Sequence, residues 1–166
     1  VEQQVEGSLA RYWHPQYRTI HTGVRLKLEE ILGRKLYNTY YYDRYYFPGQ
    51  ELTKHADRDA CEISVSIHIS TNLPDNKKYW PICVETPSGD IGEITLEPGD
   101  GLIYKGCERF HWRDPMPSPR RKLFGKNPEY YYHQIFFHYV LQNGYRTHFA
   151  GDNNPGVTQL EVEVNK

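Results

Sequence analysis

Apolar and polar residues alternate most regularly over residues 63–70, where an isoleucine or valine occupies every second position. A period of two is typical of a β-strand that buries one face. An aromatic stretch at 37–47 predicts a strand before it, since tyrosine and phenylalanine suit half-buried sheets. Shorter apolar runs bounded by Pro, Gly, Asn or Asp predict further strands at 80–85, 92–96, 101–105, 109–113 and 130–141.

A helical period occurs near the N-terminus, where Ile20, Val24, Leu28 and Ile31 recur three or four positions apart. A proline at position 15 can open a helix, and a glycine at position 33 suits its end. We therefore predict one amphipathic helix, roughly 15–32, whose apolar side lies against a sheet. Residues 1–14 are mixed in character and show no such period.

One helix followed by about eight short strands predicts a mainly β fold, an antiparallel sandwich or jelly roll with one or more N-terminal helices packed on the sheet. A chain of 166 residues is expected to form a single domain, here 1–166 with a core at about 37–141. The loop at 115–128 is long for a compact domain. Such loops often serve as lids or binding segments.

Composition limits the class of protein. A formal net charge of −1 argues against nonspecific nucleic-acid binding, which needs a basic surface. The three cysteines form neither a CxxC pair nor a disulfide framework, so we expect reduced thiols. No stretch approaches a membrane span and no signal peptide is visible, which predicts a cytoplasmic protein that does not bind membranes. The chain begins at Val1 rather than Met, so an upstream segment could have been removed.

A His-x-Asp pair, His55 and Asp57, follows a Pro-Gly turn. On an extended segment, residues two apart point to the same face, so an imidazole and a carboxylate would lie side by side. Two histidines and one carboxylate form the facial triad that holds non-haem Fe(II) with open coordination positions. We take His111, far downstream and just after an apolar strand, as the third ligand. A His-x-Asp pair alone is more often a surface pair or a turn, and only this context favours a metal.

The ordered motifs resemble those of the 2-oxoglutarate- and Fe(II)-dependent dioxygenases, and most closely the prolyl-4-hydroxylase-like branch. The matching segments cover roughly residues 37–141; they are 46–49, 55–57, 98–104 and His111. The resemblance implies a double-stranded β-helix and Fe(II) held by His55, Asp57 and His111. It also implies conversion of 2-oxoglutarate and O₂ to succinate and CO₂ as a substrate is hydroxylated. The branch favours a prolyl residue of a peptide or protein as that substrate.

One part of the family pattern has no clear match. The family usually places an Arg or Lys shortly beyond the distal histidine, where it binds the far carboxylate of 2-oxoglutarate. Arg121 qualifies by sequence distance, whereas Arg113 would share a face with His111, and we rank the two level. His133, near the start of the last predicted strand, is a third candidate. Tyr46 matches a tyrosine that often lines the co-substrate pocket, although it could equally belong to the core.

Other functions fit the same residues. A cupin-type metalloenzyme would bind metal without 2-oxoglutarate, and a related oxygenase could hydroxylate a free amino acid or another small molecule. A non-enzymatic β-sandwich binding module would use the histidines structurally, and a zinc hydrolase would need a general base that the motif lacks. We expect His68 and His138 to be sheet residues with satisfied hydrogen bonds rather than ligands.

Overall fold

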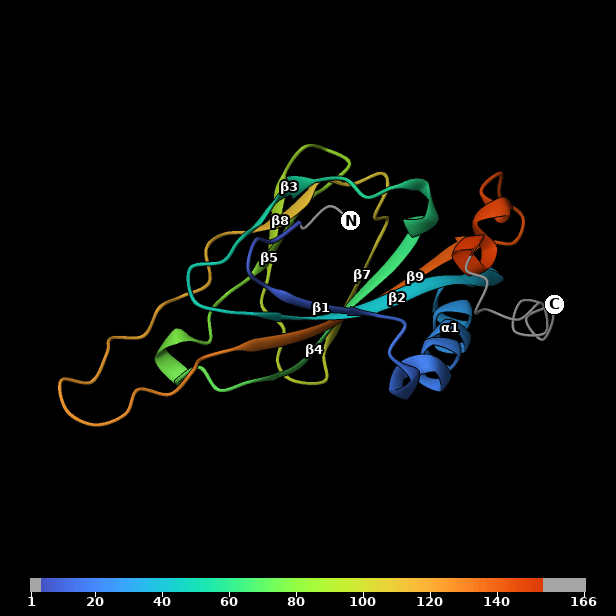
Figure 1. Ribbon diagram of the computed structural model, residues 1–166. Coiled ribbons are helices and arrows are strands. Elements are labelled where there is room, and N and C mark those ends of the chain that lie inside the picture. Colours follow the sequence, from blue (N-terminus) through green and yellow to red (C-terminus); the bar gives the residue numbers. More distant parts are fainter. Residues whose placement is uncertain (1–3, 154–166) are drawn as a thin grey trace.

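Two antiparallel β-sheets face each other in the computed structural model, which describes residues 4–153 (Figure 1). The larger sheet has the strand order β1-β2-β9-β4-β7 and the smaller one β3-β8-β5-β6. The strands are β1 (Leu9–Tyr12), β2 (Leu36–Tyr46), β3 (Leu52–His55), β4 (Ile63–Thr71), β5 (Ile82–Glu85), β6 (Ile91–Ile94), β7 (Gly101–Tyr104), β8 (His111–Arg113) and β9 (Tyr132–Leu141). This arrangement confirms the predicted mainly β jelly roll. Strand β1, which extends the larger sheet by pairing with β2, was not predicted.

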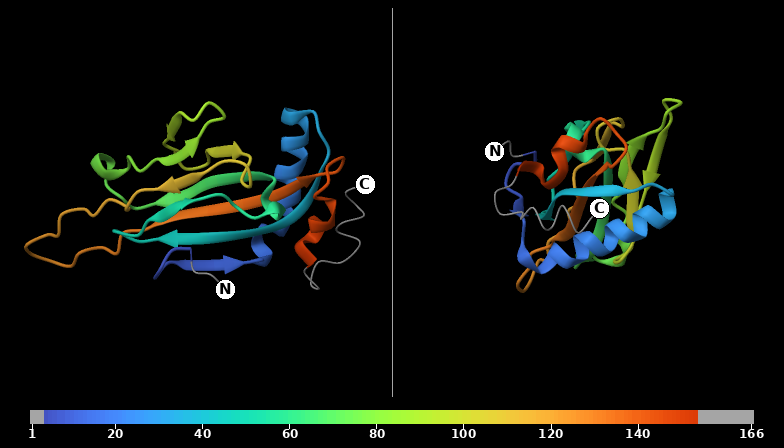
Figure 2. Two further views of the ribbon diagram at one scale, coloured as in Figure 1. Left: turned by 90° about the horizontal axis from the view of Figure 1, so that it is seen from above. Right: turned by 90° about the vertical axis from the view of Figure 1, so that its right-hand side faces the viewer.

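Helix α1 (Arg18–Leu32) follows a 3-10 turn (Pro15–Tyr17) and lies against the outer face of the larger sheet (Figure 2). It ends at Gly33, whose left-handed backbone (φ +62°) lets its N–H reach the carbonyl of Glu29 at 2.9 Å. Further 3-10 turns occur at η2 (Asp59–Cys61), η3 (Asp75–Lys77) and η4 (Thr147–Asn153). The predicted bounds of the helix therefore hold.

The apolar face predicted for α1 is only partly the buried one, because Leu28 is buried and Val24 packs against the core while other members are exposed. Ile20 and Ile31 are 47% and 58% exposed, whereas His21, Arg25 and Glu29 are buried with Leu28. Polar contacts set this rotation. Glu29 Oε1 accepts hydrogen bonds from Arg25 and from the backbone N–H of Leu36. The ring of His21 lies 3.1 Å from a carbonyl oxygen of β9. Satisfying these buried groups outweighs the burial of two further isoleucine side chains.

The core has two parts because β2 and β9 are buried on both faces. Alternate residues of these strands point between the sheets, among them Tyr42, Tyr46 and Phe136, and form the inner cluster. The intervening residues, such as Tyr41 and Phe137, pack on the other side of the larger sheet against α1. The space between the sheets is therefore lined by aromatic rings, and buried polar residues lie among them.

The predicted single domain extends beyond what is described, because residues 1–3 and 154–166 lie outside the described part. Within 4–153, no helix is long and apolar enough to cross a membrane. The loop that joins β8 to β9 extends well away from both sheets (Figure 2).

Candidate metal centre

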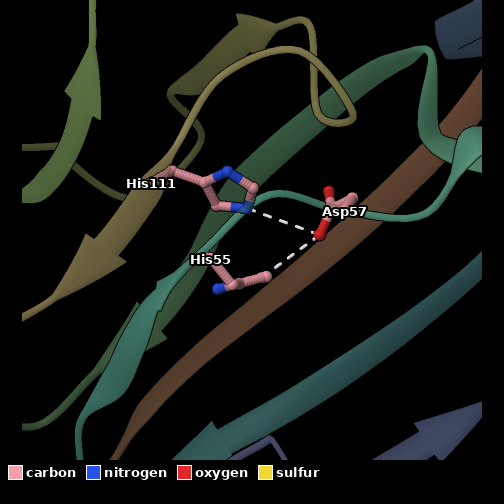
Figure 3. A group of neighbouring side chains, drawn as sticks. All are labelled: His55, Asp57 and His111. Carbon is pink, nitrogen blue, oxygen red and sulfur yellow. Dashed lines mark hydrogen bonds and ion pairs between the residues drawn. The ribbon is translucent and has the colours of Figure 1, made fainter.

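Three side chains predicted as metal ligands converge at one end of the smaller sheet (Figure 3). His55 is the last residue of β3 and pairs in register with His111, the first residue of β8, while Asp57 follows β3 directly. Asp57 Oδ1 lies 3.2 Å from Nε2 of His55 and 3.5 Å from Nε2 of His111. All three ligand atoms lie within 4.8 Å of one another. Residues far apart in sequence thus present two imidazoles and one carboxylate to a single point.

The protein fixes both rings through their other nitrogens. Nδ1 of His55 lies 2.7 Å from the carbonyl oxygen of Thr53, and Nδ1 of His111 lies 2.9 Å from that of Arg109. A carbonyl can only accept, so each Nδ1 carries a proton and each Nε2 faces Asp57. A backbone carbonyl behind each imidazole is the usual way in which proteins orient metal-binding histidines. The donor set therefore fits a divalent cation.

Asp57 and His55 shift each other's pKa values through their hydrogen bond. Burial raises the pKa of Asp57, but hydrogen bonds from His111 and His55 outweigh burial and hold that pKa below its usual range. Burial also lowers the pKa of His55, and its hydrogen bonds to Asp57 and to the Thr53 carbonyl more than reverse this, so that its pKa is raised. A metal ion bound by Nε2 of His55 would compete with a proton for that nitrogen.

Gly106 leaves room for the carboxylate. Its carbonyl accepts the backbone N–H of Asp57 at 2.9 Å. A Cβ at position 106 would lie 2.6 Å from Asp57 Oδ2 and 2.7 Å from the carbonyl oxygen of Cys61, far inside normal contact distances. Only glycine lets the backbone approach Asp57 this closely.

Two further polar residues lie beside the centre and were not predicted to do so. Cys61 and His138 offer atoms within 4.8 Å of a carboxylate oxygen of Asp57. Burial lowers the pKa of His138 to about 4, so its ring is neutral; Nδ1 bonds Ser64 Oγ at 2.8 Å and Nε2 has no partner. Burial raises the pKa of Cys61, whose thiol contacts Tyr40 Oη at 3.3 Å. The expectation that His68 and His138 have satisfied hydrogen bonds was therefore wrong, because Nε2 of His68 has no partner either. The position of His138 opposite Ser64 depends on the register of β4 and β9, which the sequence does not reveal.

An open cavity of about 1260 Å³ leads to the centre, and both His55 and Asp57 line it. Its other walls come from the N-terminal segment, the start of β2, the turn before β3 and the region around η2 and η4. They include Gln4, Tyr12, Trp13, Tyr40, Gln50 and Arg58. No residue of the loop at 115–128 lines this cavity.

The four residues considered for 2-oxoglutarate separate into two groups. Arg113 and Tyr46 are 1% and 0% exposed and point between the sheets, where each packs against Trp80. Arg121 is exposed in the long loop. His133 lies on the other face of β9, where its Nε2 is 2.7 Å from Asp43 Oδ2. The structure therefore brings only the first two into the space between the sheets.

Solved structures of other proteins share the fold of this chain. A scan against protein-family models and a search of curated proteins each found no match. Among solved structures, a prolyl-4-hydroxylase from Pseudomonas putida matches with a TM-score of 0.57 at 15% identity, over 83% of this chain and 75% of that one. The chain shares its fold with 2-oxoglutarate-Fe(II) oxygenases.

Two other solved structures have the same fold. An oxidoreductase of the 2OG-Fe(II) oxygenase family from Burkholderia pseudomallei matches with a TM-score of 0.59 at 11% identity, over 80% of this chain and 65% of that one. HygX from Streptomyces hygroscopicus, with nickel, 2-oxoglutarate and hygromycin B bound, matches with a TM-score of 0.57 at 8% identity, over 83% of this chain and 72% of that one. At these identities the likeness concerns the fold alone.

Proposed function

We propose that this protein is an Fe(II)- and 2-oxoglutarate-dependent oxygenase that hydroxylates its substrate. The observation that carries the proposal is the convergence of Nε2 of His55, Nε2 of His111 and Oδ1 of Asp57 beside an open cavity. The fold shared with oxygenases of this class supports it. A structural role for the two histidines would not require both Nε2 atoms to face one carboxylate while both Nδ1 atoms bond backbone carbonyls.

His55, Asp57 and His111 would hold Fe(II) on one side and leave its remaining positions open to the cavity. When bound, the metal supplies the redox chemistry that couples decarboxylation of 2-oxoglutarate to hydroxylation of the substrate. The protein positions the reactants. Gly106 and the carbonyls of Thr53 and Arg109 fix the ligands.

Arg113 would bind the far carboxylate of 2-oxoglutarate. Its Nη1 donates to the carbonyl oxygen of Trp80 at 2.7 Å, which holds the guanidinium in place, and its Nε has no partner. The rings of Trp80 and Tyr132 pack on the guanidinium, and Tyr46 closes the same space. A planar guanidinium that is fixed and dry is well suited to a carboxylate, which it can bind through two parallel hydrogen bonds.

The substrate class has two candidates. The prolyl-4-hydroxylase of the same fold favours a prolyl residue of a peptide or protein. HygX, with hygromycin B bound, shows that this fold also accommodates a small molecule. The cavity is open and mixed in character, with Tyr12 and Trp13 beside acidic and amide side chains, and is compatible with either.

The test is an anaerobic titration with Fe(II) and then 2-oxoglutarate, in which the visible charge-transfer band of the chelate is recorded. We expect the band in the wild type and its loss in His111→Ala. His148→Ala, at an exposed histidine remote from the three ligands in sequence, is the matched control and should retain it. Fe(II) binding without a band would remove 2-oxoglutarate from the proposal. Failure to bind Fe(II) would refute it.

A further inference from the structure

Arg44 is a second buried cation between the sheets. It lies on β2, is 2% exposed, and is surrounded by the rings of Tyr42, Tyr46 and Phe136, whose centroids lie 5.3 to 5.9 Å from its Cζ. Its polar contacts are weak. Nη1 lies 3.5 Å from Tyr46 Oη, Nη2 lies 3.4 Å from Gln4 Oε1, and Nε has no partner. No carboxylate among the described residues forms an ion pair with it. Within that part of the chain Arg44 is thus a buried cation without an anion, which is costly and would favour a negatively charged ligand.

Gln134 adds donor capacity at the same place. It faces Arg44 directly across the β2–β9 pair and is 0% exposed. Both its amide nitrogen and its amide oxygen lack a partner. Buried polar atoms are almost always hydrogen-bonded, so adjacent unpaired groups on Arg44 and Gln134 mark a place where a ligand belongs.

This inference rests on the proposed function, in which the co-substrate needs only one of the two buried arginines, Arg113 and Arg44. One carboxylate of 2-oxoglutarate would bind the metal with its neighbouring keto oxygen, and the other would bind one arginine. Arg113 suits that role because its contacts, Trp80 and Tyr132, do not line the open cavity, whereas Arg44 contacts Gln4 in the wall of that cavity. Arg44 then remains for another anion.

The position of Arg44 indicates which anion. Gln4, which contacts Arg44, lines the cavity that also contains His55 and Asp57. The same Gln4 oxygen lies 3.5 Å from Tyr42 Oη. An amide oxygen from the N-terminal segment therefore occupies the place that one oxygen of a carboxylate would take, at the wall of the cavity.

We propose that Arg44, assisted by Tyr42 and Gln134, binds a carboxylate of the substrate, and that this carboxylate displaces the side chain of Gln4. The substrate would then be a carboxylate-bearing peptide or small molecule. Glu6 and Glu51 also line the cavity, and their charges disfavour a polyanion. A single carboxylate at the Arg44 end is the charge pattern that the cavity accepts.

The test uses acetate as the minimal carboxylate and acetamide as its neutral isostere. The readout is the side-chain Nε–Hε NMR signal of Arg44, identified by its loss in Arg44→Lys. Titrations up to roughly 100 mM are run on the protein alone and on the protein saturated with Zn(II) and 2-oxoglutarate. We expect a saturable shift with acetate in both states and none with acetamide.

Variants of Gln4 make the test independent of substitutions at Arg44. Gln4→Glu places a carboxylate of the chain itself beside Arg44, and the high effective concentration of that group should weaken acetate binding at least about tenfold. Gln4→Ala removes the competing oxygen and should strengthen acetate binding.

Two results would overturn the proposal. One is an Arg44 signal that acetate does not move. The other is an Arg44 signal that shifts when 2-oxoglutarate is added and then no longer responds to acetate, which would assign Arg44 to the co-substrate. Failure of 2-oxoglutarate to bind would refute the proposed function alone, because the acetate response of the protein without additions still tests Arg44.

Discussion

Replacement of Arg113 by Met separates a ligand-binding role from a structural one. The change keeps a long side chain and removes the guanidinium. Truncating one partner of a buried hydrogen-bonded charge pair costs about 2–5 kcal/mol of binding free energy. We therefore expect the dissociation constant of 2-oxoglutarate to rise by about 30-fold or more. The Fe(II)–2-oxoglutarate band, recorded against co-substrate concentration, measures this directly.

The stability of the ligand-free variant supplies the second half of that test. Without a ligand, Arg113 is 1% exposed and has no anionic partner within residues 4–153, so its removal relieves the cost of a buried charge. The Trp80 carbonyl loses the donor that lies at 2.7 Å, which offsets the gain. We expect the free energy of unfolding in urea to change by less than about 1 kcal/mol. Arg121→Met, at an exposed position, should alter neither quantity. Unchanged co-substrate affinity in Arg113→Met, or equal losses in both variants, would refute the reasoning.

Two other substitutions test the site and the sheet. In Gly106→Ala, the new Cβ would lie 2.6 Å from Asp57 Oδ2, and we expect Fe(II) affinity in a competition titration to fall at least about tenfold. Gly23→Ala, with nothing within 4 Å, should leave that affinity unchanged, and similar affinities in the two variants would contradict the steric argument. Asp43→Asn should lower the free energy of unfolding at pH 7 by about 2 kcal/mol, because Asp43 is fully buried between Arg11 and His133. Burial raises the pKa of Asp43, but hydrogen bonds from His133 and Arg11 outweigh it and lower that pKa. The stabilisation is therefore present above the unfolded pKa of about 3.9 and is lost as the pH falls through the folded value. The difference in unfolding free energy between Asp43→Asn and wild type, measured in urea, should be smaller at pH 3 than at pH 7. A difference independent of pH would count against this account.

Turn residues made most of the strands predictable from the sequence. Proline, glycine or asparagine follows most of the strands within a few residues, and alternation identified β4 as a strand. It did not show which face of β4 is buried, because Ser64, Ser66 and His68 are as buried as the apolar residues between them.

The orientation of α1 was not predictable in this way. Its buried face includes Arg25 and Glu29, which an apolar period counts as solvent-facing. Arg25 and Glu29 pair with each other one helical turn apart, and Glu29 also bonds Lys35 and the backbone of Leu36 beyond the helix. An apolar period does not reveal that these charged groups are buried.

The metal centre was more predictable from the sequence than the proposed anion site at Arg44. His55 and Asp57 are two residues apart, so their meeting follows from local geometry. His111 was proposed from its place just after a distant apolar strand, and the family resemblance agrees with it. Arg44 lies in an aromatic strand that is buried on both faces, and therefore alternation does not distinguish inside from outside. Its position opposite Gln134 follows from the pairing of β2 with β9, a register that tertiary structure sets.

The charges between the sheets provide a final argument for an acidic substrate. A bound Fe(II) and the two arginines would bring four positive charges, and Asp57 cancels one of them. The histidines add none when they bind a metal, because their Nε2 atoms are then unprotonated. A 2-oxoglutarate dianion cancels two more, which leaves one positive charge in a buried space lined by aromatic rings. Because an uncompensated buried charge is strongly unfavourable, one more anion would stabilise the proposed complex with metal and co-substrate. A substrate carboxylate at Arg44 would supply that anion, so that binding of the substrate, rather than of the co-substrate alone, would bring the interior to neutrality.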